Sequence, residues 1–135
     1  MASPNPFAGT WTLGSWTSLK NGEPVGYPMG EDARGQIIYG DGHMSAFLMR
    51  ADFPDSGGEI TPDTFLSYAG TWSFADGRIT HLVEFSSLAH WVGRSLVRYV
   101  ERNGDEMFLR TEPERSKSGS VYEHELFWRR AASPG

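Results

Sequence analysis

The sequence predicts an all-β fold, an eight-stranded antiparallel up-and-down β-barrel. Three observations lead to this prediction: three dipeptides typical of tight turns, a regular alternation of short and long connections, and a surplus of glycine and aromatic residues. The chain has 135 residues, which is enough for one domain. Sixteen of them are glycine and 13% are aromatic, which favours strands and turns over a helix bundle.

The turn dipeptides are Asp41-Gly42, Asp76-Gly77 and Asn103-Gly104, each flanked by β-type sequence. They are typical of two-residue hairpin turns, because both central residues of a type I′ turn need a positive φ. With a first and a last strand added, the predicted strands are 10–19, 34–40, 43–49, 68–75, 78–85, 95–102, 105–111 and 120–130.

The remaining connections are long, and we expect one short helix in the loop between the third and fourth strands. Thr61 could cap it, Pro62 suits its first position and Asp63 suits its N-terminal dipole. Alternate connections of a meander lie at the same end, so one end is closed by tight turns and the other is an open mouth. The long loops predicted at the mouth are 20–33, 50–67, 86–94 and 112–119.

We predict a single domain over residues 7–130, with flexible termini at 1–6 and 131–135. The net charge of −5 argues against a nucleic-acid partner, and the absence of cysteine excludes disulfides and thiolate chemistry. The N-terminus lacks a signal-peptide pattern and no apolar run is long enough to span a bilayer. We therefore expect a cytoplasmic protein with no membrane partner.

The tight turns fix the register, and therefore which side chains face the interior. Tyr39 should face Met44, Trp72 should face His81, and Tyr68 should face Phe85. Trp11 should plug the closed end beside Trp128, close to Arg129 and Arg130. Trp91, in the loop after the fifth strand, could cover the mouth or only pack that loop. The expected ligand-binding residues are Tyr39, Met44, Leu48, Trp72, Phe85, Trp91, Leu96, Leu109, Tyr122 and His124.

Three polar residues of this interior are candidates for catalysis. His81 could act as a general acid or base, because imidazole titrates near neutrality, or it could be a neutral residue held by a tyrosine or a backbone group. Arg98 could bind a carboxylate, enolate or carbonyl oxygen of a ligand. Otherwise it needs a loop carboxylate such as Glu31 or Asp32, or carbonyl and tyrosine oxygens. Tyr68 could polarise a ligand oxygen or serve only as wall.

Neither a metal nor a cofactor is expected. The four histidines, His43, His81, His90 and His124, show none of the close spacings of zinc sites. The nucleophile-elbow, P-loop and dinucleotide-binding glycine motifs do not occur.

Several motifs resemble the small bacterial and fungal lipocalin-like domain family. Gly9-Thr10-Trp11 is similar to the Gly-x-Trp signature of the lipocalin superfamily, in which a C-terminal arginine, here Arg129 or Arg130, often packs on the tryptophan. The segment 27–35 resembles that family more specifically. It is followed by Tyr39, the first turn, Met44-Ser45-Ala46, Gly70, Thr80-His81, Trp91-Val92-Gly93 and Arg98. The resemblance implies an eight-stranded barrel and a small apolar ligand, and related barrels include carriers as well as cyclases and isomerases.

We expect the barrel to bind a small, largely apolar molecule with at least one oxygen function. It could also catalyse a cofactor-free cyclisation or isomerisation, with His81 moving the proton while Arg98 and Tyr68 polarise an oxygen. The alternatives are a non-catalytic intracellular carrier or sensor, and a structural domain with a filled core. A homodimer is also possible through an outer apolar face at Val97, Tyr99 and Phe108.

Overall fold

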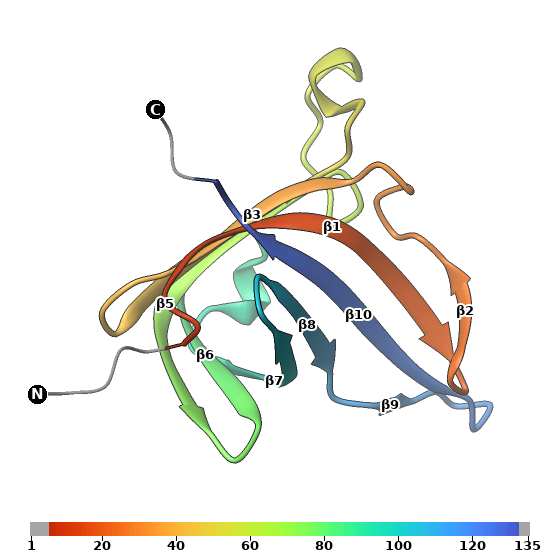
Figure 1. The fold of residues 1–135 in the computed structure, drawn as a ribbon. Helices are drawn as coiled ribbons and strands as arrows, with labels where there is room; N and C mark the ends of the chain where they lie inside the picture. The colour runs from red at the N-terminus through yellow and green to blue at the C-terminus, as the bar shows by residue number, and fades with distance from the viewer. Residues whose placement is uncertain (1–5, 133–135) are drawn as a thin grey trace, which may run out of the picture.

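Eight long antiparallel strands close into a barrel in the computed structural model, which describes residues 6–132 (Figure 1). Each strand lies beside its neighbour in sequence, so the barrel is the predicted up-and-down meander. The long strands are β1 (Gly9–Lys20), β3 (Arg34–Tyr39), β4 (His43–Met49), β5 (Phe65–Ala75), β6 (Arg78–Ser86), β7 (Ser95–Asn103), β8 (Glu106–Thr111) and β10 (Val121–Arg130).

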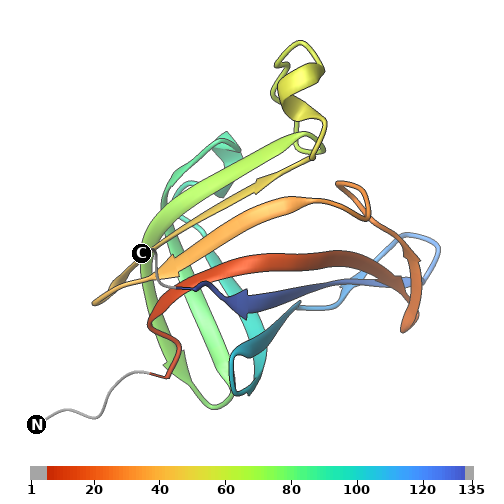
Figure 2. The same ribbon diagram turned by 45° about the horizontal axis from the view of Figure 1, so that its top comes forward.

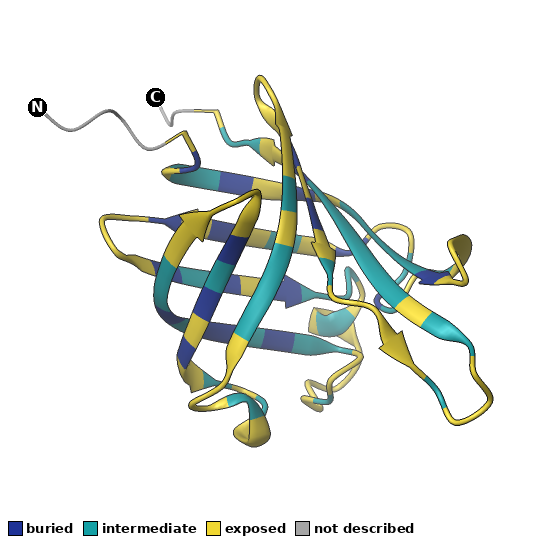
Figure 3. Cartoon of the chain, turned by 90° about the horizontal axis from the view of Figure 1, so that it is seen from below, coloured by how far each residue is buried: buried dark blue, intermediate teal, exposed yellow. Residues whose placement is uncertain are grey.

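The pairing of β1 with β10 closes the barrel. β1 is long enough to pair with β3 through its first residues and with the short strand β2 (Glu23–Gly26) through its last ones. A second short strand, β9 (Glu114–Arg115), pairs with the start of β10. Buried and exposed residues alternate along the barrel strands, so one face of the sheet lines the interior (Figure 3).

The first two tight turns have the predicted register. Tyr39 pairs with Met44 across the first turn, and Trp72 pairs with His81 across the second. Asp76 and Gly77 both have positive φ, as a type I′ turn requires, whereas in the first turn only Gly42 does. The dipeptide therefore predicts the place of both turns, and the type I′ geometry holds at one of them.

The third turn lies one residue later than predicted. Asn103 pairs with Glu106, so Gly104 and Asp105 form the turn. Arg98 consequently faces Thr111, whereas a turn at Asn103-Gly104 would place it opposite Leu109. Moving a turn by one residue changes each cross-strand partner by two positions. Because side chains alternate with a period of two, the inward set of this hairpin is unchanged.

A β-bulge beside Gly70 corrects the prediction for Phe85. Gly70 pairs with Val83, but Ala69 pairs with Phe85 and Tyr68 with Ser86, so Glu84 is an extra residue in β6. A Cβ atom on Gly70 would lie only 1.8 Å from the Leu82 carbonyl oxygen, which explains why glycine stands at this point. Phe85 consequently turns to the outer surface, where it is 70% exposed, and does not face Tyr68.

The predicted helix at 61–63 is wrong. This segment forms a turn in which the Thr61 backbone N–H donates to the Thr64 hydroxyl, and neighbouring Ile60 is exposed and offers no apolar face for a helix to pack. The two helical segments of the described chain are single 3₁₀ turns, η1 (Phe53–Asp55) and η2 (Ala89–Trp91). η1 belongs to the β4–β5 loop, which projects away from the barrel (Figure 2). Within residues 6–132 we find no helix with the length and hydropathy to cross a membrane.

The closed end is plugged by Trp11 and Trp128, both fully buried, as predicted. The Arg130 guanidinium lies 4.3 Å from the centre of the Trp11 ring and donates hydrogen bonds to the carbonyls of Ala8 and Pro6. The arginine that packs on the tryptophan is therefore Arg130, while Arg129 lies over Phe127 on the outside. Of the predicted flexible termini, residues 1–5 and 133–135 lie outside the described part of the chain.

Candidate functional site

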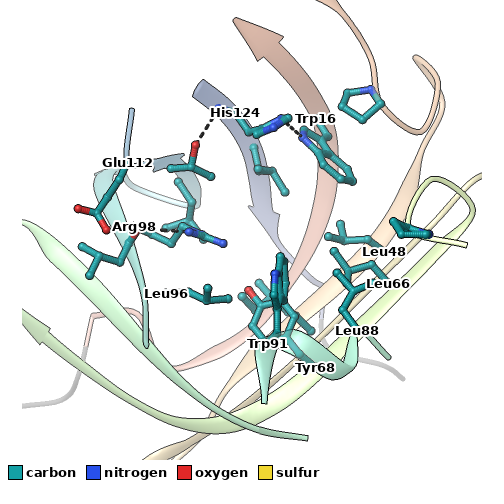
Figure 4. A pocket seen from close by; sticks show the side chains of 18 of the residues that line it. Trp16, Leu48, Leu66, Tyr68, Leu88, Trp91, Leu96, Arg98, Glu112 and His124 are labelled. Atoms are coloured by element: carbon teal, nitrogen blue, oxygen red, sulfur yellow. Dashed lines mark hydrogen bonds between the residues drawn. The ribbon is translucent and has the colours of Figure 1, made fainter. Parts of the chain in front are cut away.

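A cavity of about 660 Å³ occupies the open half of the barrel. Its wall combines inward side chains of the strands with loop residues at the mouth, including Pro28, Pro62 and Glu112 (Figure 4). The volume lies in the range of small-molecule sites, and most of the inner wall is apolar. The apolar side chains that line it include Trp16, Ile37, Leu48, Leu66, Leu88, Trp91, Leu96, Leu109, Leu126 and Trp128.

The predicted site residues divide into two groups. Eight of them line the cavity: Leu48, Tyr68, Trp91, Leu96, Arg98, Leu109, Tyr122 and His124. Five do not: Tyr39, Met44, Trp72 and His81 pack on the interior side away from the cavity wall, and Phe85 lies outside. The inward direction predicted for Tyr39, Met44 and His81 is therefore confirmed, but these side chains belong to the packed half of the barrel.

His81 is held between two tyrosines. The Tyr39 hydroxyl lies 2.7 Å from Nε2 of His81, and the Tyr68 hydroxyl lies 3.0 Å from Nδ1. All three side chains are buried, and His81 has no exposed surface. Of these three hydrogen-bonded residues, only Tyr68 lines the cavity. Any proton exchange between His81 and a bound molecule therefore has to pass through the Tyr68 hydroxyl.

The donors and acceptors of Tyr39, His81 and Tyr68 determine which group donates in each of the two hydrogen bonds. A neutral imidazole has one N–H donor and one acceptor nitrogen. Among the described residues His81 is the one acceptor for the buried Tyr39 hydroxyl, so Tyr39 donates to Nε2 and the proton of His81 lies on Nδ1. Nδ1–H then donates to the Tyr68 oxygen, which leaves the Tyr68 O–H free to donate into the cavity.

The three groups are uncharged near neutral pH. Burial, with the positive charge of Arg98, lowers the pKa of His81 to about 3. Burial raises the pKa of Tyr39 and of Tyr68, and Arg98 opposes that rise in each case. Tyr39, His81 and Tyr68 are therefore linked by hydrogen bonds between neutral groups, and each of these bonds polarises the next.

Arg98 points into the cavity without a carboxylate partner. Its guanidinium donates from Nη1 to the Val97 carbonyl at 3.2 Å, and a hydrogen bond to the Tyr68 side chain lowers the pKa of that tyrosine. Glu31 and Asp32, which we expected as possible partners, form no ion pair with it, and neither do Glu112 and Glu114 at the mouth. A half-buried guanidinium in an apolar wall thus keeps most of its donors available.

His124 has a defined tautomer because of Trp16. The Trp16 indole Nε1–H can only donate, and it lies 3.0 Å from Nδ1 of His124, so Nδ1 is the acceptor. Burial and the charge of Arg98 lower the pKa of His124, which keeps the ring neutral with its proton on Nε2. The described residues offer that Nε2–H no hydrogen-bond partner.

Trp16 was missed by the sequence reasoning. Strict alternation from Trp11 and Leu13 directs Ser15 inward, but the register of β1 against β10 shifts between Leu13 and Ser15 and turns Trp16 to the inside. Gly14, at the shift, was the available signal, because a glycine inside a strand pattern often marks a bulge. Thr111 was predicted to face the interior but was not among the predicted site residues.

Trp91 lies at the mouth, as predicted. Its ring meets Tyr68 edge to face with 5.5 Å between the ring centres, and η2 holds it over the end of β6. In Figure 4, Trp91 and Tyr68 form one side of the cavity, while Trp16 and His124 form the opposite side. Arg98 extends between them.

Within the described residues, no three histidine, aspartate or glutamate side chains gather in a way that could hold a metal ion. The fold and the cavity agree with a comparison against protein families, in which the lipocalin-like domain matches residues 8–131. The chain belongs to the lipocalin-like domain family. A search of curated proteins found no match. A lipocalin-like fold implies the binding of a small ligand in general, and in this member the half-buried or buried polar groups of the cavity wall include Tyr68, Arg98, Thr111 and His124.

Proposed function

We propose that this lipocalin-like barrel binds a small, largely apolar molecule and holds one of its oxygen atoms with Tyr68 and Arg98. One observation carries the proposal: an apolar cavity of about 660 Å³ contains an Arg98 guanidinium without a carboxylate partner. A half-buried cation is costly unless an acceptor satisfies it, and a bound ligand would supply that acceptor.

The wall supports the apolar part of such a ligand. Leu48, Leu66 and Leu96 lie around the cavity, and Trp16 and Trp91 face each other across it. Burial of apolar surface contributes about 25 cal/mol per Å², so the wall would provide most of the affinity and the polar groups the orientation.

The direct test is native mass spectrometry of the protein purified from its own host, followed by identification of any compound that remains bound. A defined compound with an apolar body and at least one oxygen atom supports the proposal. Protein that carries no compound, and that also fails to bind N-phenyl-1-naphthylamine in a fluorescence titration, contradicts it.

Catalysis is the second candidate function, and it is favoured by the two hydrogen bonds that link Tyr39, His81 and Tyr68. The reaction would be a cofactor-free cyclisation or isomerisation within one substrate, so no atom is exchanged with the protein and no co-reactant is needed. Tyr68 and Arg98 would polarise the substrate oxygen by hydrogen bonding, and the aromatic walls would hold a reactive conformation. His81 would position and polarise Tyr68 instead of meeting the substrate.

Two variants separate catalysis from an intracellular carrier or sensor. Incubation of the co-purified compound, or of its linear precursor, with wild-type protein should give an isomer of the same mass, and Tyr68→Phe and Arg98→Gln should each slow its formation about a hundredfold. A carrier returns the compound unchanged from all three proteins, and the two variants alter only its affinity.

A further inference from the structure

The polar residues on the β7–β8–β10 side of the cavity form a row across three adjacent strands. Arg98 on β7 pairs directly with Thr111 on β8, and the Thr111 hydroxyl accepts a hydrogen bond of 2.8 Å from the backbone N–H of His124 on β10. Neighbouring strands lie about 4.8 Å apart, so the three backbones span about 10 Å of the wall. All three residues line the cavity.

Each of the three side chains in this row has a free donor. Arg98 has guanidinium N–H groups left over after its hydrogen bonds to Val97 and Tyr68. The Thr111 oxygen accepts from His124, so its own O–H remains to donate. The Trp16 indole occupies Nδ1 of His124, so the Nε2–H of His124 remains as a third donor.

The carboxylates near this row form no ion pair with Arg98, and the nearest electrostatic effect is that of Glu114, which opposes the lowering of the His124 pKa. Glu112, Glu114 and Asp63 contribute to the cavity wall, but all three are exposed at the mouth and none forms an ion pair with Arg98. The charge of Arg98 acts both on His124 and on Tyr68, which lie on opposite sides of the cavity, so the guanidinium has a central position.

This pattern suits an anion better than a neutral oxygen. A carbonyl oxygen offers two lone pairs, whereas a carboxylate offers about four acceptor positions and a compensating negative charge. Three donor residues with one net positive charge, and with no acid inside the cavity, match the second case. We propose that the molecule bound in the barrel is an amphipathic acid, whose carboxylate is held by Arg98, Thr111 and His124 while its apolar part fills the cavity. The inference rests on the proposed small-molecule function and names the chemical class of its ligand.

Two fluorescent probes provide the test, because 8-anilino-1-naphthalenesulfonate carries the ring system of N-phenyl-1-naphthylamine plus one anionic group. Wild-type protein should bind the anionic probe about tenfold or more tightly than the neutral one. Arg98→Gln should remove this preference by weakening the anionic probe alone. Arg102→Gln is the matched control: it makes the same charge change on the same strand, at an exposed residue bonded to Gly104, and should leave both affinities unchanged.

His124→Gln should weaken the anionic probe several-fold and spare the neutral one. A comparison that needs no variant is displacement of the neutral probe by decanoate and by methyl decanoate, where decanoate should compete about tenfold better. Equal competition, or equal loss of both probes in Arg98→Gln, overturns the acid-binding inference while leaving small-molecule binding in place. If neither probe and neither competitor binds, the proposed function itself fails.

Discussion

The Tyr39 hydroxyl donates to Nε2 of His81 at 2.7 Å, far from solvent and behind the wall of the cavity. This contact fixes the histidine tautomer and, through it, the direction in which Tyr68 presents its proton. A residue that touches no ligand thereby sets the hydrogen-bonding character of one that does.

Removal of the Tyr39 hydroxyl should act on stability first. Tyr39→Phe leaves Nε2 of His81 buried without a donor, which should lower the free energy of unfolding by about 1–3 kcal/mol. Urea unfolding measures the loss. Affinity for N-phenyl-1-naphthylamine should change less than about threefold, because Tyr39 does not line the cavity. Unchanged stability would show that the bond is not formed in solution.

The protein should lose stability in acid through His81. Its folded-state pKa of about 3 lies below the value near 6.5 expected for the unfolded chain, so the unfolded chain binds the proton first. This contribution is complete above about pH 6.5 and falls toward pH 3, by about 1.4 kcal/mol per pH unit. Urea unfolding between pH 7.5 and pH 4 should show a shallower dependence in His81→Gln than in wild type.

His43→Gln is the control for this pH dependence, because His43 is exposed on β4 and its replacement should leave the wild-type slope intact. The wild-type protein gives a check that needs no variant: the ring protons of His81 should keep the chemical shift of a neutral imidazole down to about pH 4. Titration of His81 near pH 6.5 would contradict the prediction.

Arg130 should contribute more to the free energy of unfolding than its neighbour Arg129. Arg130→Ala removes the stacking on Trp11 and the hydrogen bonds to Ala8 and Pro6, which together should cost about 2 kcal/mol. Arg130→Lys should recover only part of this loss, because an ammonium lacks the planar donor pair. Arg129→Ala should cost less than about 1 kcal/mol. Equal melting temperatures for the two alanine variants would refute the ranking.

Gly70 should tolerate no side chain. A Cβ atom there meets the backbone oxygen of Leu82 at 1.8 Å, so Gly70→Ala requires the two strands to separate and should cost about 3 kcal/mol. Gly40→Ala is a matched control, because the nearest atom to its added Cβ lies at 3.5 Å and φ is not positive. Thermal unfolding of the two variants should differ by well over 5 °C. Similar melting temperatures would mean that the bulge relaxes at no cost.

The sequence predicts this fold well where local chemistry decides the structure. Asp41-Gly42 and Asp76-Gly77 are sufficient to place two hairpins with the right partners, and the order of strands follows from the lengths of the connections. The helix prediction at 61–63 failed because capping residues alone do not stabilise a helix that has no apolar face to bury.

Prediction of the site was limited by two register shifts. Alternation carried past Gly14 misses Trp16, and alternation carried past Gly70 directs Phe85 to the wrong face. Each shift depends on contacts with the neighbouring strand, which one strand's pattern does not contain. Whether His81 reaches the cavity depends on which side chains pack around it in the interior. The sequence therefore predicts that these side chains point inward, but not which of them contact the cavity.

The extra residue Glu84 in β6 has a consequence for how such a barrel changes its capacity. With Glu84 present, the small side chain of Ser86 stands opposite Tyr68 and the ring of Phe85 lies outside. Regular pairing of the same sequence past Gly70, with Glu84 opposite Ala69, would instead bring the ring of Phe85 into the space beside Tyr68. The position of one bulge can therefore exchange a roomy interior for a filled one, without replacing any amino acid of the wall.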